Sequence, residues 1–149
     1  MNINIRGRLF DLSKPKVMGI LNLTPDSFYD GGVHNEINKI EDHVNMMVND
    51  GMDILDIGGY SSKPGAKNIS VDEELSRVIP ILKHIRKIFP ELVISIDTFR
   101  SKIASASLNE GADIINDISG GTLDKNMMSV VAKNNCPYIL MHMQGNPQN

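Results

Sequence analysis

The sequence predicts an α/β protein, a (β/α)8 TIM barrel of which these 149 residues hold the first five β/α units and an amino-terminal hairpin. Apolar runs typical of strands buried on both faces alternate with runs that have helical periodicity. The apolar runs also share an ending, because each is followed by a polar or acidic side chain. These strand-end residues are Asn22, Asp56, Asp97, Asn116 with Asp117, and His142.

The strand ends decide between two architectures. A doubly wound open sheet would use mainly the strand ends that flank its switch point. A barrel instead gathers the carboxyl end of every strand around one mouth. No G-x-G-x-x-G fingerprint of a dinucleotide-binding fold links the first strand to a helix. Polar residues at the ends of five successive strands therefore favour the barrel.

Residues 1–15 form the expected hairpin and connector, and residues 16–149 the five strands of one incomplete barrel domain. Ile3 and Ile5 alternate with polar residues, and Gly7 offers a turn. We expect strands over residues 16–21, 52–57, 93–97, 113–117 and 137–142. The first helix carries an apolar stripe that stops at Gly51, and later helices are expected at 102–109 and 124–133.

The second helix begins with a capping box, Ser70 to Glu73. Pro80 lies inside its apolar stripe, so we expect a kink or a local break there. The loop from Asn22 to about residue 35 is longer than most connections between elements. Loops of that length are often functional lids.

Composition excludes several classes of function. The net charge of −3, without a basic run, gives no electrostatic footprint for nucleic acid. No apolar run approaches ~18 residues, so we expect no membrane span. The single Cys136 excludes an internal disulfide framework and suits the reducing cytoplasm.

Asp97 and Asn116 are the candidate catalytic and substrate-binding residues, since each ends a buried apolar run. A carboxylate accepts hydrogen bonds from a paired ring N–H and exocyclic amine, and an amide both donates and accepts. Together they suit a flat heterocycle of guanidine character, such as a pterin. The alternative is that both side chains only anchor neighbouring backbone N–H groups; a ring of such residues favours a site.

Most of the other polar residues at the strand ends and loops have both a functional and a structural interpretation. Asn22 could ligate Mg²⁺ beside a phosphate or cap the loop backbone. Ser62 and Lys63, on a Gly-rich loop, could contact a phosphate or remain solvated. Asp56 fits a structural anchor, and His142 a ligand or a packed ring. No motif of a covalent nucleophile occurs, so orientation and electrostatic help for a leaving group fit better.

Five segments resemble the motifs of dihydropteroate synthase, in the same order and over nearly the whole chain. The first spans a strand end and its loop, the second a Gly-rich loop, and the others are the next three strand ends. They are residues 18–28 with 30–32, 56–66, 95–98, 114–118 and 141–147.

The resemblance implies a (β/α)8 barrel of folate biosynthesis that joins 6-hydroxymethyl-7,8-dihydropterin diphosphate to 4-aminobenzoate, with Mg²⁺ and release of diphosphate. It implies Asn22 as a metal ligand, and Asp97 and Asn116 at the pterin ring with Ile118 beside it. It also implies sensitivity to sulfonamides, and a homodimer is compatible with the full-length protein. The loops implied to close over the other substrate groups carry Ser62, Lys63 and Pro64 on one side, and Thr24, Asp26 and Phe28 on the other.

This sequence departs from the family pattern in three ways. Lys63 stands where the family has Arg and cannot make its bidentate fork to phosphate. Tyr60 replaces an acidic residue. The family's last three strands, with a further Asp, a Lys and an Arg/His pair, have no counterpart. We therefore expect a fragment or truncated product whose polypeptide alone lacks synthase activity.

Two other functions are weighed against the synthase. One is a pterin-dependent methyltransferase, which shares the barrel and the pterin. The loop from Asn22 to Phe28 and the loop at Pro64 argue against it, because they suit diphosphate and aminobenzoate. The other is a non-catalytic pterin-binding module.

Overall fold

The computed structural model describes residues 1–23, 33–61 and 68–142, without the side chains of residues 33–36. Two strands form an antiparallel hairpin, β1 (Asn2–Ile5) and β2 (Arg8–Asp11). Five strands form a parallel sheet: β3 (Met18–Asn22), β4 (Ile54–Gly58), β5 (Val93–Asp97), β6 (Ile114–Asp117) and β7 (Tyr138–Leu140). The helices between them are α2 (Val33–Asn49), α3 (Val71–Ile88), α4 (Ser101–Asn109) and α5 (Met127–Asn134).

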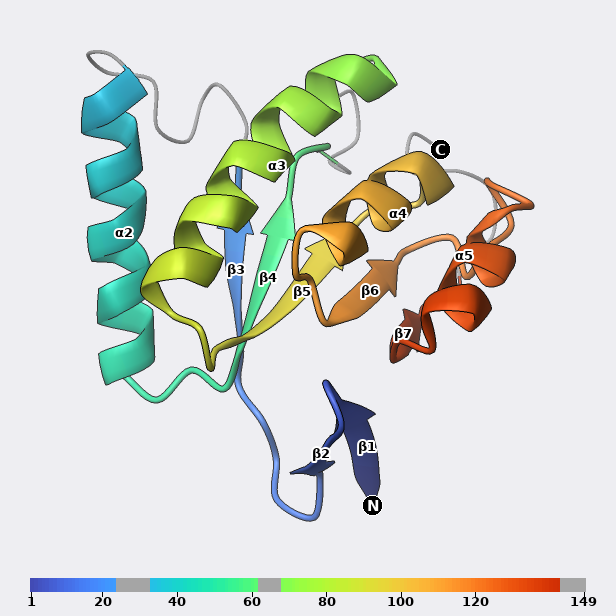
Figure 1. Cartoon of the computed structure of the whole chain (residues 1–149), viewed down its shortest axis with the longest axis horizontal. Helices are drawn as coiled ribbons and strands as arrows, with labels where there is room; N and C mark the ends of the chain where they lie inside the picture. The colour runs from blue at the N-terminus through green and yellow to red at the C-terminus, as the bar shows by residue number, and fades with distance from the viewer. Residues whose placement is uncertain (24–32, 62–67, 143–149) are drawn as a thin grey trace.

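The strand order identifies the architecture. The sheet runs β3-β4-β5-β6-β7, so sequence neighbours are also spatial neighbours and the order never reverses. The four helices of the described residues cover the same face of the sheet, as Figure 1 shows. A doubly wound sheet would have helices on both faces and a switch point. The predicted arrangement of five parallel barrel strands alternating with helices is therefore confirmed.

Side chains alternate between two cores, one on each face of the sheet. Leu55, Ile57, Ile94 and Ile96 point toward the helices and belong to the larger core. Ile54 and Val93 belong to the other core, on the face that becomes a barrel's interior, together with Ile5 and Ile114. Since both faces are buried, the strands read as continuous apolar runs.

The hairpin closes the amino-terminal end of this inner face, and Figure 1 shows it below the tails of the strand arrows. Ile5 is buried against Ile54, Val93 and Ile114, with Ile3 and Phe10 beside them. The predicted hairpin is thus present and acts as a plug. The hairpin does not cover the carboxyl ends of the strands.

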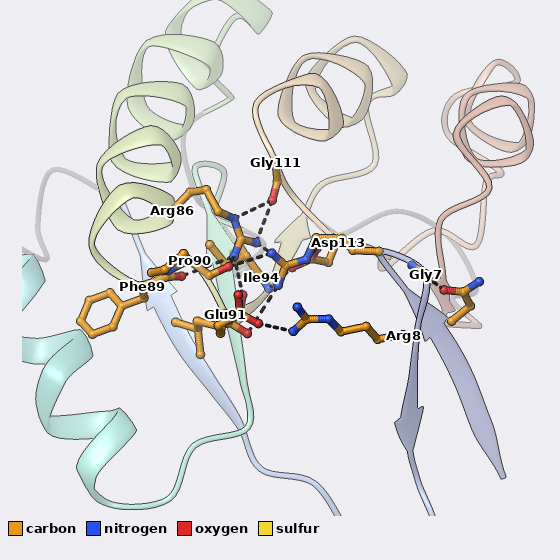
Figure 2. Close-up of polar contacts among 12 residues, drawn as sticks. Gly7, Arg8, Arg86, Phe89, Pro90, Glu91, Ile94, Gly111 and Asp113 are labelled. Atoms are coloured by element: carbon orange, nitrogen blue, oxygen red, sulfur yellow. Dashed lines mark hydrogen bonds and ion pairs between the residues drawn. The ribbon is translucent and has the colours of Figure 1, made fainter.

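An ionic network fastens this plug, centred on the buried carboxylate of Asp113 (Figure 2). Arg86 Nη2 donates to Asp113 Oδ2 at 2.7 Å, and the backbone N–H of Ile94 donates to the same oxygen at 2.8 Å. Arg6 Nε of the hairpin lies 2.9 Å from Asp113 Oδ1. Arg8 pairs with Glu91 at the surface. Asp113 thus joins the hairpin, a helix and the sheet.

Helix ends follow the predicted signals. Ser70 Oγ accepts a hydrogen bond from the Glu73 backbone N–H at 3.0 Å, which confirms the cap of α3. Gly51 and Gly111, after α2 and α4, have φ angles of +97° and +98°. Such left-handed angles favour glycine and end a helix. Within the described parts of the chain, no helix is both long and apolar enough to cross a membrane.

Several element boundaries differ from the prediction, and an expected break in one helix is absent. β3 begins at Met18 rather than residue 16, because the Asp53 carboxylate holds Lys16 Nζ and the Val17 backbone N–H, each at 2.9 Å. β7 ends at Leu140, which leaves His142 beyond the sheet. Of the two alternatives expected at Pro80, a kink or a local break, the break is wrong, since α3 runs unbroken through it. Buried side chains on both sides of the proline hold the helix together: Val78, Leu82 and Ile85.

We predict that Gly59→Ala lowers the free energy of unfolding by about 1–3 kcal/mol through overpacking, whereas Gly19→Ala costs less. A Cβ on Gly59 would lie 2.7 Å from Val78 Cγ2 and 3.2 Å from Glu74 Cγ, both on a packed helix. A Cβ on Gly19 would meet the thioether ends of Met52 and Met47, which can rotate away. Urea unfolding of both variants checks this, and equal losses would contradict it.

Candidate functional site

Four residues form one row across the carboxyl ends of the strands. Asn22 pairs in register with Gly58, Gly58 with Asp97, and Asp97 with Asn116. A Cβ on Gly58 would lie 3.4 Å from Asp97 Oδ2 and 3.5 Å from Asn22 Oδ1. The missing side chain at Gly58 therefore leaves room where an amide oxygen and a carboxylate converge. We call these four residues the strand-end row.

Backbone hydrogen bonds beyond the strands hold this row in place. The Leu23 N–H donates to the Gly58 carbonyl at 2.7 Å, and the Thr98 N–H donates to the Asn116 carbonyl at 3.0 Å. Each bond continues the ladder by one residue. The strand-end row is thus built on rigid backbone rather than on a free loop.

A buried polar layer lies beside the row on the inner face. Asn116 Nδ2 donates to Asp56 Oδ2 at 3.0 Å, and Ser95 is the register partner of Asp56. Three buried atoms here have no partner among the described residues: Asp56 Oδ1, Ser95 Oγ and Asn116 Oδ1. An unpaired buried polar atom costs about 1–3 kcal/mol. Such a group of atoms is expected where water or a ligand completes the bonding.

Asp97 carries the largest electrostatic perturbation of the row. Burial raises the pKa of its carboxyl to about 7, and the negative charges of Asp56, Glu74 and Asp117 add to the rise. Burial also raises the pKa of Asp56, and the neighbouring Ser95 hydroxyl and Asn116 amide oppose the rise. A carboxyl with a pKa near neutrality, in a row of convergent polar groups, is a candidate functional group.

Comparison with known proteins decides the family. The family model described as "Pterin binding enzyme" matches residues 18–149. The chain belongs to the pterin-binding enzyme family. Its resemblance to this family, expected from five short motifs, is confirmed over the whole parallel sheet.

Individual family members agree with this assignment. Dihydropteroate synthase of Escherichia coli (strain K12) is 47% identical over 148 residues, which are 99% of this chain and 52% of that protein. The structure of the Yersinia pestis dihydropteroate synthase with a sulfonamide drug complex matches with a TM-score of 0.86 and 42% identity, over 100% of this chain and 53% of that one. The structure of the Xanthomonas albilineans dihydropteroate synthase with 4-aminobenzoic acid matches with a TM-score of 0.87 and 39% identity, over 97% of this chain and 53% of that one. The chain therefore spans about half the length of these family members.

Six of the predicted site residues belong to the two loops that follow β3 and β4. Thr24, Asp26, Phe28, Ser62, Lys63 and Pro64 lie outside the described residues. Of the other predicted site residues, the structure brings Asn22, Asp97 and Asn116 together in the strand-end row. Ile118 is partly buried in the turn after β6.

Three other polar residues at strand ends do not join the row: Asp56, which lies in the buried polar layer beside it, Asp117 and His142. Asp117 faces the helices, where its carboxylate accepts from the Ser119 and Gly121 N–H groups and from the Tyr138 hydroxyl at 2.7 Å. It is an anchor for the following turn. His142 is exposed beyond the end of β7.

Behind the row lies an ion pair that the sequence reasoning missed. Glu74 of α3 is almost completely buried and accepts from Thr98 Oγ1 at 2.9 Å and Arg100 Nη1 at 2.7 Å. Arg100 also donates to the Ile69 carbonyl at 2.7 Å. A signal was available, since Glu74 falls on the same helical stripe as the buried Val78.

Tyr60, the departure from the family's acidic residue, has a structural role here. Its ring packs edge-on against Phe99 with centroids 5.1 Å apart, and the Arg100 guanidinium lies 5.2 Å from its centroid. Its hydroxyl is 3.2 Å from Asn68 Oδ1. Tyr60 therefore bridges the two described ends of the Gly-rich loop.

Oxygen ligands for a cation are sparse in the described part of the chain. No three His, Cys, Asp or Glu side chains gather there as a metal cluster. Asn22 is exposed, and its neutral Oδ1 points to the same spot as Asp97 Oδ2. This donor set fits Mg²⁺, which keeps several waters and takes few protein ligands beside substrate phosphates.

A separate cavity of about 270 Å³ opens at the other end of the sheet. Its lining includes Arg6, Asp113, Asn134 and Cys136. Burial raises the pKa of the Cys136 thiol, which makes it a poor nucleophile. Barrel enzymes place their active sites at the carboxyl ends of the strands, whereas the amino-terminal end of the barrel serves stability. This cavity lies at the amino-terminal end, so we assign it no part in catalysis.

Proposed function

We propose that this chain is the amino-terminal part of a dihydropteroate synthase, which condenses 6-hydroxymethyl-7,8-dihydropterin diphosphate with 4-aminobenzoate. The observation that carries the proposal is the 47% identity to a dihydropteroate synthase across 99% of this chain. The strand-end row supports it, because its donors and acceptors suit the pterin ring.

In this proposal Asp97 and Asn116 bind the pterin. The ionised Asp97 carboxylate accepts hydrogen bonds from ring N–H or amino groups, and the unpartnered Asn116 Oδ1 accepts another. Ile118 would lie beside the ring. Negative charge at Asp97 would also stabilise positive charge that develops on the pterin during the reaction.

Asn22 would hold Mg²⁺ next to the diphosphate of the substrate. The bound cation would neutralise charge on the leaving diphosphate. Ser62 and Lys63 would contact the same phosphates by hydroxyl and ammonium groups. Pro64 and the first loop, with Thr24, Asp26 and Phe28, would enclose the aminobenzoate side.

The chemistry that we propose is dissociative. The C–O bond to diphosphate breaks with both electrons on the oxygen, and a resonance-stabilised pterin cation remains. The aniline nitrogen of 4-aminobenzoate then forms the C–N bond and loses one proton. The protein contributes orientation and electrostatic stabilisation, so the reaction needs no protein nucleophile.

The cellular setting is part of the same proposal. The lone Cys136 supports a reducing compartment such as the cytoplasm. A homodimer of the whole protein is compatible with this arrangement.

Ordered binding tests the proposal. We define the hybrid protein as this chain followed by the carboxyl-terminal part of the E. coli synthase that the chain does not cover. Calorimetry with the hybrid should show 4-aminobenzoate binding only after the pterin diphosphate. Binding of pterin without any binding of 4-aminobenzoate would point instead to a methyltransferase or a non-catalytic module.

We predict that the 149-residue polypeptide alone has no synthase turnover. β3 and β7 are the edges of the described sheet, and Ile20 and Leu140 on them are 62% and 61% exposed. The row is therefore walled by these five strands on one side only. Product formation is assayed with labelled 4-aminobenzoate, and measurable turnover by the purified chain would refute the prediction.

A further inference from the structure

Asp56 makes a contact that packing alone does not require. It lies on β4, two residues before Gly58, and only 5% of it is exposed. Its Oδ2 accepts from Asn116 Nδ2 at 3.0 Å, across 60 positions of sequence. Its Oδ1 is buried and has no partner among the described residues. A buried carboxylate with one amide partner is costly, which suggests a role for that contact.

The contact determines the orientation of the Asn116 amide. The oxygen and nitrogen of an amide are nearly the same size, so shape alone does not decide which atom faces which neighbour. An ionised carboxylate can only accept hydrogen bonds. Asp56 therefore holds the nitrogen of Asn116, and Asn116 Oδ1 becomes the atom left as a free acceptor. That oxygen is buried and unpartnered within the described structure.

We propose that Asp56 is a positioning residue, which fixes Asn116 Oδ1 as the acceptor for a ring N–H of the pterin. Asp56 acts through Asn116 and need not touch the ligand. The identity of the ligand rests on the proposed function, whereas the orientation of the amide does not. Nothing in the sequence links Asp56 to Asn116, because they lie on strands that are not adjacent.

The ligand-free chain tests the orientation directly. In ¹³C,¹⁵N-labelled 149-residue protein, the Asn116 side-chain amide should show one downfield, exchange-protected proton. A scalar coupling across the hydrogen bond, from Asn116 Nδ2 to the Asp56 carboxylate carbon, should be detectable in the parent. This measurement needs no variant, and absence of the coupling would overturn the proposal.

Three variants separate positioning from a general structural effect. Asp56→Ala should lose the downfield signal of Asn116, and Asp56→Asn should keep it, since its amide oxygen can still accept. Ser95→Ala is the matched control, because Ser95 is the register partner of Asp56 with an equally unpaired buried atom. It should leave the Asn116 signal in place. An unchanged signal in folded Asp56→Ala would overturn the proposal.

Titration of the same samples with 6-hydroxymethylpterin tests the consequence. Asp56→Ala should weaken binding about tenfold, the loss expected for one oriented hydrogen bond. Asn116→Ala and the double variant should bind equally, because Asp56 acts only through Asn116. Additive losses would overturn the proposal. Failure of the parent to bind pterin at all would instead contradict the proposed function, and the amide signals would still decide the role of Asp56.

Discussion

Asp97→Asn is expected to make the 149-residue chain more resistant to urea at pH 7 and to remove most of the pterin affinity that we propose for the strand-end row. Burial raises the pKa of the Asp97 carboxyl to about 7 in the folded protein, against an ordinary value of 3.8. Between these values the folded chain keeps a proton that the unfolded chain has released. The folded state is therefore destabilised progressively as the pH rises from about 4 to about 7.

The size of the effect follows from the shift. Each pKa unit corresponds to about 1.4 kcal/mol, so a shift of about three units gives an upper bound of about 4 kcal/mol. Asn at position 97 carries no charge and removes this cost. The stability difference between variant and parent should hence be small near pH 4 and grow toward pH 7 and above.

Urea unfolding at a series of pH values measures this difference, and Asp53→Asn is the control of opposite sign. Hydrogen bonds from the Val17 N–H and from Lys16 lower the pKa of Asp53. A carboxyl whose pKa is lower in the folded state than in the unfolded state stabilises the fold at pH values above its unfolded pKa. This contribution is lost as the pH falls through the folded pKa. Asp53→Asn should thus destabilise the chain at pH 7. A pH-independent difference for Asp97→Asn would contradict the account.

Asp113→Ala is expected to destabilise the fold by about 3–5 kcal/mol, the cost of breaking a buried ion pair from one side. The side chain of Asp113 is completely buried, and that of Arg86 is 17% exposed. Removing the carboxylate leaves the Arg86 charge without its counter-ion and the Ile94 N–H without an acceptor. It also releases Arg6, which ties the hairpin to the sheet.

Glu110→Ala is the matched control for this prediction. Glu110 pairs with Lys83 at 3.2 Å, and their side chains are 38% and 58% exposed. An exposed pair of this kind contributes less than about 1 kcal/mol. In chemical denaturation, Asp113→Ala should have a much lower free energy of unfolding than Glu110→Ala, and Asp113→Asn should lie between them. Equal losses for the two alanine variants would show that the network in Figure 2 does not fasten the fold.

Order and type of the elements could be predicted because local signals agreed with the tertiary fold. Val93 to Ile96 read as a strand buried on both faces, and Ser70 with Glu73 marked a helix start that the structure confirms. Pro80 was misleading, since packing around it outweighed one lost backbone hydrogen bond. Local propensity is a weak prior where a helix is fixed by its buried face.

The inner or outer direction of a strand-end residue could not be read from the sequence. Asn116 and Asp117 are adjacent and must point to opposite faces. Because both faces are apolar, no alternation shows which of the two faces inward. In the structure, Asn116 lies in the strand-end row, and Asp117 accepts a hydrogen bond from the Tyr138 hydroxyl. Likewise, the hydrogen bond from Asn116 to Asp56 depends on the register between strands, and the pattern of residues in one sequence does not determine that register.

Turnover by the hybrid protein tests the central claim, that the strand-end row of this chain binds the pterin of a dihydropteroate synthase. Formation of dihydropteroate from pterin diphosphate and 4-aminobenzoate would be measured for the hybrid and for its Asp97→Ala and Asn116→Ala variants. The account predicts product from the hybrid and a loss of about 10- to 100-fold in kcat/KM for each variant. A folded hybrid that forms no product, or variants that keep full turnover, would contradict it.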